Sequence, residues 1–153
     1  MEPKIRRALP EDLSAVCKVV RETIRAVYPR YYPAGAVELF LSYHSDEAIA
    51  ADISEGIVFV SEPEGSVVGT VTVRRDEVCR MFVLPQFQGR GFGGELLRFA
   101  ESEIGKSFGT ARLDASLSAK GLYLRRNYMT IDFSRKTAQN GDFLCYDTMI
   151  KRL

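Results

Sequence analysis

A cluster of glycines stands directly in front of a helical pattern. Residues 88–94 read QGRGFGG and are followed by ELLRFAESEI. Glycine is favoured where the backbone must turn tightly or approach something closely, because it has no side chain. The amide groups at the amino terminus of a helix are unpaired and hold phosphate groups. The sequence therefore predicts a phosphate-binding loop formed by Gly89, Gly91, Gly93 and Gly94.

A nicotinamide dinucleotide is one phosphate ligand to consider. Gly89, Gly91 and Gly94 fit the spacing G-x-G-x-x-G, and Asp114 follows about 20 residues later. In dinucleotide-binding folds the glycines follow their strand almost at once, whereas LPQFQ intervenes here after Val83. Predicted antiparallel hairpins, rather than a βαβ unit, precede the loop. Dinucleotide binding is therefore the weakest of the hypotheses.

A longer phrase, VCRMFVLPQFQGRGFGGELLRFAE, resembles the signature of the GCN5-related N-acetyltransferases (GNAT). That signature, [QR]-x-x-G-x-[GA], opens a helix after a strand, and Gln88, Gly91 and Gly93 supply it here. Downstream, SLSAKGLYLRRNY resembles the family pattern N-x-x-A-x-x-L-Y-x-x-x-G-F, with serine at 116 in place of asparagine and Asn127 in place of glycine. Asparagine tolerates a left-handed backbone, so the second replacement preserves the geometry. The resemblance covers most of the chain from residue 57 on, and residues 1–56 only loosely.

The resemblance implies that acetyl-CoA binds as a co-substrate and that no metal is required. The pyrophosphate would lie on the glycine loop, and the pantetheine arm would follow the strand MFV, which in this family splays from its neighbour. Arg90 suits a phosphate contact and a solvent-facing position equally well. The cofactor-binding residues implied in this way are Met81, Phe82, Val83, Gln88, Gly89, Arg90, Gly91, Phe92, Gly93, Gly94, Ser116 and Tyr123.

Three residues are implied in catalysis: Met81, Glu77 and Tyr123. By resemblance, the backbone amide of Met81 donates to the thioester carbonyl and Tyr123 donates to the leaving sulfur. Amine attack needs a proton acceptor, because an alkylammonium has a pKa of about 10.4. Glu77 lies four positions before Met81, a spacing that predicts a shared sheet face. Asp76, Glu38 and ordered water remain alternatives for the base.

The family places acceptor specificity in the first helices, their connecting loop and the last hairpin. Tyr28, Tyr31 and Tyr32 lie near that loop and are the predicted substrate-binding residues, although aromatic side chains there would also suit a sheet edge. His44 is expected to be a surface or capping histidine. Cys79 carries no sign of an activated thiol, which favours direct transfer without an acyl-enzyme.

Hydrophobic periodicity predicts the elements that position these residues. Helices are expected over 10–27, over 34–44, over 45–56 with Ser45 as N-cap, from the glycines to Ile104, and over 118–127. Strands are expected over 4–8, in a hairpin over 57–75, and over 77–84, 111–117, 129–134 and 143–151, the last two joined at Asn140-Gly141. This order predicts an α+β fold in a single domain over residues 1–153. With the resemblance it implies a GNAT-like fold, a mostly antiparallel twisted sheet of about six to seven strands with about four to five helices.

Composition excludes several classes of protein. A net charge of +1 offers no attraction for nucleic acid or an anionic membrane. The charged amino terminus and the absence of a long apolar run predict a cytoplasmic protein. With three widely spaced cysteines and one histidine, a disulfide framework, a zinc site and a serine triad are not expected.

The predicted function is acetyl-CoA-dependent N-acetylation of a primary amine on a small molecule, peptide or protein. The alternative is a non-catalytic module that senses acyl-CoA, and nicotinamide-dinucleotide binding is a distant third. The acceptor is the expected partner, and the closing hairpin is a possible homodimer surface.

Overall fold

The computed structural model describes residues 4–153, which form one mixed sheet of seven strands with five α-helices. The strand order is β1-β2-β3-β4-β5-β7-β6, and every neighbouring pair is antiparallel except β4 and β5. The strands are β1 (Ile5–Arg7), β2 (Val58–Ser61), β3 (Gly69–Arg74), β4 (Glu77–Val83), β5 (Thr110–Ser116), β6 (Met129–Thr137) and β7 (Phe143–Arg152). The predicted α+β fold is confirmed.

The helices are α1 (Leu13–Val27), α2 (Ala34–Tyr43), α3 (Asp46–Ser54), α4 (Phe92–Gly105) and α5 (Lys120–Arg125). Helices α1, α2 and α3 pack in one apolar core with β2 and Phe82, whereas α4 and α5 contribute to a second core with β3, β5 and Met149. The predicted apolar face of α4 is confirmed, because Leu96, Leu97 and Ala100 are all buried. The helices thus cover the two faces of the sheet.

Polar side chains lie at the starts of α1 and α3. Asp12 accepts a hydrogen bond from the amide of Leu9 at 2.7 Å and pairs with Arg6, so the predicted helix 10–27 starts with a 3-10 turn before α1. Ser45 accepts a hydrogen bond from the amide of Ala48 at 3.2 Å. The predicted N-cap of α3 is confirmed.

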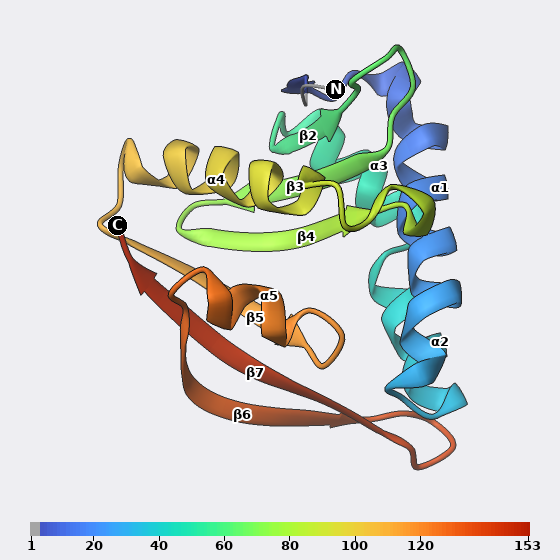
Figure 1. Ribbon diagram of the computed structural model, residues 1–153. Helices are drawn as coiled ribbons and strands as arrows, with labels where there is room; N and C mark the ends of the chain where they lie inside the picture. The colour runs from blue at the N-terminus through green and yellow to red at the C-terminus, as the bar shows by residue number, and fades with distance from the viewer. Residues whose placement is uncertain (1–3) are drawn as a thin grey trace.

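Strands β4 and β5 pair for only two residues and then separate (Figure 1). The pairs are Glu77 with Arg112 and Val78 with Leu113, and no later pair joins the two strands within residues 4–153. Backbone groups of β4 beyond Val78 are therefore left open on the β5 side. The splay implied by the family resemblance is confirmed, and it opens a gap in the middle of the sheet.

A β-bulge at Cys79 corrects one prediction. Thr72 pairs with Arg80 and Val73 pairs with Val78, so Cys79 is an extra residue in β4. Directly paired residues of antiparallel strands point to the same face, and one extra residue inverts the alternation of faces along the strand. Glu77 therefore shares a face with Arg80, whereas Met81 pairs with Val71 on the opposite face. The predicted shared face of Glu77 and Met81 is wrong.

The closing hairpin docks its tip on α2. The loop at Asn140-Gly141 joins β6 and β7, with Gly141 at φ +90°, and Ala138 donates to the carbonyl of Asp142 at 2.8 Å. The Asp142 carboxylate accepts from the amide of Gly35 at 2.8 Å. The predicted hairpin is confirmed, and its tip is tied to the first turn of α2.

Candidate active site

Two cavities lie on either side of the gap between β4 and β5. The glycine-side cavity has a volume of about 360 Å³ and is lined by Gln88, Gly89, Gly91, Gly93 and Gly94, among others. The hairpin-side cavity, about 190 Å³, is lined by residues of α2, β4, β5, β6 and β7. Four residues line both cavities: Tyr28, Met81, Phe82 and Ala119. A ligand in one cavity can therefore meet a ligand in the other at this junction.

The glycine loop turns sharply into α4. Gly89 has φ +78° and Gly91 has φ +91°, values that L side chains rarely adopt, and Gly91 is the N-cap residue of the helix. The side-chain amide of Gln88 donates to the backbone carbonyl of Val83 at 2.9 Å, and the Thr23 hydroxyl donates to the same oxygen at 3.2 Å. The first amides of α4 carry no side-chain cap, so they are free to hold an anion.

Two arginines add positive charge to the glycine-side cavity. No pattern in the sequence predicted them. Arg125 and Arg126, at the end of α5, line it beside the glycines. A Cβ on Gly94 would collide with the Arg126 guanidinium, so glycine at this position lets the arginine lie against α4. The next residue, Asn127, has φ +72°, which confirms the predicted left-handed backbone.

Four of the implied cofactor residues do not line the glycine-side cavity: Arg90, Phe92, Ser116 and Tyr123. The Arg90 guanidinium lies 5.3 Å from the ring centre of Phe87 and does not line the cavity. The Phe92 side chain is buried in the core, so only its backbone amide could serve a phosphate. The hydroxyl of Ser116 lies 2.9 Å from that of Ser118, and Ser116 lines the hairpin-side cavity.

Tyr123 is buried and lines the hairpin-side cavity. Burial raises its pKa above the ordinary value for a phenol, and the neighbouring Tyr28 raises it further. Burial also raises the pKa of Tyr28. Both phenols are therefore neutral donors at physiological pH.

The other two tyrosines of the predicted acceptor group lie outside the cavities. Tyr31 is exposed. The Tyr32 hydroxyl donates to the carbonyl of Cys145 and accepts from the amide of Leu117, both at 2.8 Å. Tyr32 thus ties the β5–α5 connection to β7, and Tyr28 is the member of this group that lines the site.

Two carboxylates approach one another near the start of the splay. Asp114 lines the hairpin-side cavity and accepts a hydrogen bond from the Thr148 hydroxyl at 2.8 Å. Glu77 lines neither cavity. Its burial raises the pKa of its carboxyl, and the nearby charge of Asp114 raises this pKa further. Asp114 was not predicted as a proton acceptor, because its approach to Glu77 depends on the pairing of β4 with β5.

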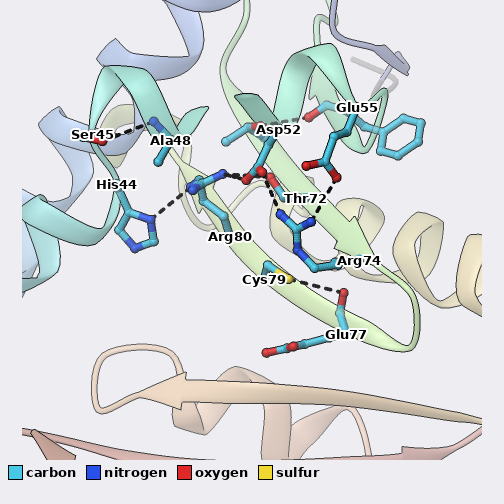
Figure 2. A network of polar contacts seen from close by, with 12 residues as sticks. His44, Ser45, Ala48, Asp52, Glu55, Thr72, Arg74, Glu77, Cys79 and Arg80 are labelled. Carbon is cyan, nitrogen blue, oxygen red and sulfur yellow. Dashed lines mark hydrogen bonds and ion pairs between the residues drawn. The ribbon is translucent and has the colours of Figure 1, made fainter. Parts of the chain in front are cut away.

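A polar network joins α3 to the cavity wall (Figure 2). The buried Arg80 donates to Asp52 at 2.9 Å and, through Nε, to Nδ1 of His44 at 3.0 Å. Arg74 shares the Asp52 carboxylate and also pairs with Glu55. The two arginines and two carboxylates balance in charge, which makes a buried arginine tolerable.

His44 is the C-cap residue of α2, but it also lines the hairpin-side cavity. Burial, and then the charge of Arg80, lowers its pKa to about 3. The imidazole is therefore neutral and a poor proton acceptor. The expectation of a surface or capping histidine is confirmed by the C-cap position, and the half-buried ring lies between Phe40 and Phe82.

Cys79, the bulge residue, lines the same cavity. Burial raises the pKa of its thiol to about 11, and the charge of Glu77 adds to the effect. A thiol with this pKa is protonated at neutral pH, so it is a weak nucleophile.

Among residues 4–153 there is no group of three or more His, Cys, Asp or Glu side chains that could hold a metal ion. No helix in this part of the chain is long and apolar enough to cross a membrane.

Comparison with known proteins agrees with this geometry. A GCN5-related N-acetyltransferase from Rhodopseudomonas palustris superposes with a TM-score of 0.91 at 24% identity, covering 100% of this chain and 97% of that one. PaiA N-acetyltransferase from Thermoplasma acidophilum, solved in complex with coenzyme A, has a TM-score of 0.75 at 20% identity and covers 100% of both chains. The ribosomal-protein-S18-alanine N-acetyltransferase from Escherichia coli has a TM-score of 0.71 at 18% identity, over 99% of this chain and 94% of that one.

These superpositions show that the chain shares the fold of the three proteins. None of the curated proteins matches the sequence. The family model of the acetyltransferase (GNAT) domain, however, matches residues 27–151. That range contains the glycine loop, both cavities except Thr23, and Tyr123. The chain therefore belongs to the acetyltransferase (GNAT) family.

Proposed function

We propose that this protein transfers the acetyl group of acetyl-CoA directly to a primary amine. The observation that carries the proposal is the meeting of the two cavities at Tyr28, Met81, Phe82 and Ala119. The glycine-side cavity has the features of a phosphate site, and the hairpin-side cavity has room for a second small ligand. Two substrates entering from opposite sides of the gap would meet without an acyl-enzyme.

The residues of the glycine-side cavity fit coenzyme A. The free amides at the start of α4 would hold its pyrophosphate, with charge added by Arg125 and Arg126. The pantetheine arm would follow β4 where it leaves β5, along Met81 to Val83. When bound, acetyl-CoA supplies an activated acetyl group at the junction. The Met81 amide is the proposed donor to its carbonyl, where a donor is commonly worth about 10²–10³ in rate.

Proton removal is assigned to the two carboxylates. Asp114 is the carboxylate that lines the hairpin-side cavity, so it would receive the ammonium of the acceptor. Glu77 is the proposed final proton acceptor, directly or through water, because its raised pKa favours the protonated form more than an ordinary glutamate does. Asp76, in the β3–β4 turn, and the exposed Glu38 line neither cavity. His44 is unsuited to the task with a pKa of about 3.

Tyr123 is the proposed donor to the leaving sulfur. Its raised pKa disfavours complete proton transfer to the thiolate, since a thiol has an ordinary pKa of about 8.5. A hydrogen bond that stabilises the thiolate is the expected contribution. Loss of such a bond in Tyr123→Phe would lower kcat by up to about tenfold.

Calorimetry with coenzyme A and a screen of acetyl-CoA consumption against polyamines, amino acids, aminoglycosides and peptides test the proposal. We expect coenzyme A binding and turnover of at least one amine, with kcat reduced about 10²-fold or more in Asp114→Asn or Glu77→Gln. Binding without turnover in all three proteins would favour the sensing module. Affinity for NAD with indifference to coenzyme A would favour the dinucleotide hypothesis.

A further inference from the structure

The polar groups of the hairpin-side cavity separate by charge. Asp114 on β5 is its negative group. At the other end are Lys136 on β6 and His44 at the end of α2. Arg80 also lines the wall, but its charge is balanced by Asp52. An acceptor in this cavity would therefore meet a carboxylate at one end and hydrogen-bond donors at the other.

The proton on His44 is placed by its neighbour. Arginine can only donate, so the hydrogen bond from Arg80 Nε at 3.0 Å requires Nδ1 of His44 to be the unprotonated nitrogen. The neutral ring then carries its proton on Nε2. In Figure 2 this second nitrogen faces away from Arg80. The network with Asp52 and Thr72 holds the donor in this tautomer.

Lys136 is the uncompensated charge at this end. Its register partner across the hairpin is Leu144, which also lines the cavity. Its Nζ lies 4.8 Å from the ring centre of Tyr43, the residue before His44. No ion pair to Lys136 occurs among the ion pairs that lysines form within residues 4–153. A positive charge and a neutral N–H donor thus both line this cavity, a pair suited to a carboxylate.

Strand register measures the separation of the two ends. Lys136 stands opposite Leu144 and Asp114 opposite Thr148, four residues further along β7. Four residues of antiparallel strand span about 14 Å along β7, and the positions of β5 and β6 on opposite sides of β7 add about 10 Å across it. The reach of the lysine side chain shortens this separation. The amine and carboxylate of an α-amino acid share one carbon and are too close together to use both ends. The cavity volume of about 190 Å³ gives room for a small ligand between the two ends.

We propose that the acceptor carries a carboxylate several bonds from its reacting amine, as in an ω-amino acid or a lysine-like side chain with its free carboxylate. Lys136 and His44 bind the carboxylate, and Asp114 receives the ammonium. This inference rests on the proposed acetyl transfer for the identity of the reacting group. The carboxylate site itself can be tested by binding alone.

The test compares 6-aminohexanoate with 6-aminohexanamide, which differ in charge and little in shape. Calorimetry on the protein saturated with coenzyme A measures binding, and acetyl-CoA consumption measures kcat/KM. We expect the acid to be favoured about five- to tenfold in both, the range of one exposed charge contact together with a hydrogen bond. Lys136→Met should abolish this preference, and Lys136→Glu should invert it towards 1,6-diaminohexane. Lys106→Met, at the far end of α4, is the matched control and should keep the preference of the unaltered protein.

Each outcome separates the two proposals. Equal use of acid and amide, or a preference that survives Lys136→Met, overturns the carboxylate site while acetyl transfer stands. Tighter binding of the acid that depends on Lys136, without acetyl transfer to any amine, supports the carboxylate site and overturns the proposed reaction. His44→Phe keeps an aromatic ring between Phe40 and Phe82 but removes the donor, and should lower the preference for the acid. An unchanged preference in that variant overturns the role of His44.

Discussion

Replacing Gly94 with alanine should separate cofactor affinity from stability. The residue lies in the first turn of α4, and a Cβ there would meet the Arg126 guanidinium, the far end of a flexible side chain. The guanidinium can move aside, while alanine favours the helix by up to about 1 kcal/mol over glycine. Thermal stability should therefore stay the same or rise slightly. Coenzyme A should bind about tenfold more weakly, because displacing Arg126 removes a charged hydrogen bond worth about 1.5 kcal/mol or more.

A double-mutant cycle identifies the cause. Arg126→Ala should weaken coenzyme A binding by a similar factor, and the double variant should be no weaker than either single variant, since both remove the same contact. Gly105→Ala is the matched control, because it lies in the same helix and its Cβ would make only an ordinary contact with Leu153. Calorimetry measures the affinity and thermal melting the stability. Unchanged affinity in Gly94→Ala, or fully additive losses in the double variant, would refute the placement of Arg126 against the cofactor.

Three further predictions concern stability and assembly. The pKa of Glu77 is raised in the folded protein. Glu77 therefore adds to the free energy of unfolding below its ordinary pKa of about 4.3, and this contribution is lost as the pH rises through its pKa in the folded protein. Glu77→Gln should consequently melt at a higher temperature than the unaltered protein at pH 7, with the difference vanishing near pH 4; a lower melting temperature at pH 7 would contradict this. Tyr32→Phe removes two hydrogen bonds of 2.8 Å and should destabilise the protein by about 1–3 kcal/mol in urea titrations, with coenzyme A affinity of the folded protein unchanged. If the edge strand β6, with Met129, Ile131 and Phe133 exposed, pairs two copies, the protein should sediment as a dimer and Phe133→Asp as a monomer; a monomeric unaltered protein would argue against that surface.

The local features of the site could be predicted from the sequence. Glycines at 89 and 91 followed by a helical repeat predict a left-handed turn into an open helix end, and each step depends on a few neighbouring residues. The same holds for Ser45 at the start of α3 and for Asn127 in its left-handed conformation. The splay of β4 from β5 came from family resemblance, because pairing between distant strands leaves no local pattern.

The parts that escaped prediction depend on long-range packing. The bulge at Cys79 exists because β3 and β4 shift register, and it moves Glu77 to the face opposite Met81. Arg126 reaches the glycines only because the end of α5 lies close to the first turn of α4. His44 and Arg80 are 36 residues apart and meet through the packing of α2 on the sheet. None of these contacts has a signature in sequence spacing.

Transfer of isotope-labelled acetyl from acetyl-CoA to an amine, followed by mass spectrometry, tests the central claim most directly. With 6-aminohexanoate as acceptor, we predict label on the amine nitrogen and none on the protein, at a rate reduced about 10²-fold or more in Asp114→Asn. Label retained on Cys79 would contradict direct transfer. Coenzyme A binding with no labelled amine, across the whole acceptor panel, would contradict the proposal that the two cavities bring a thioester and an amine together.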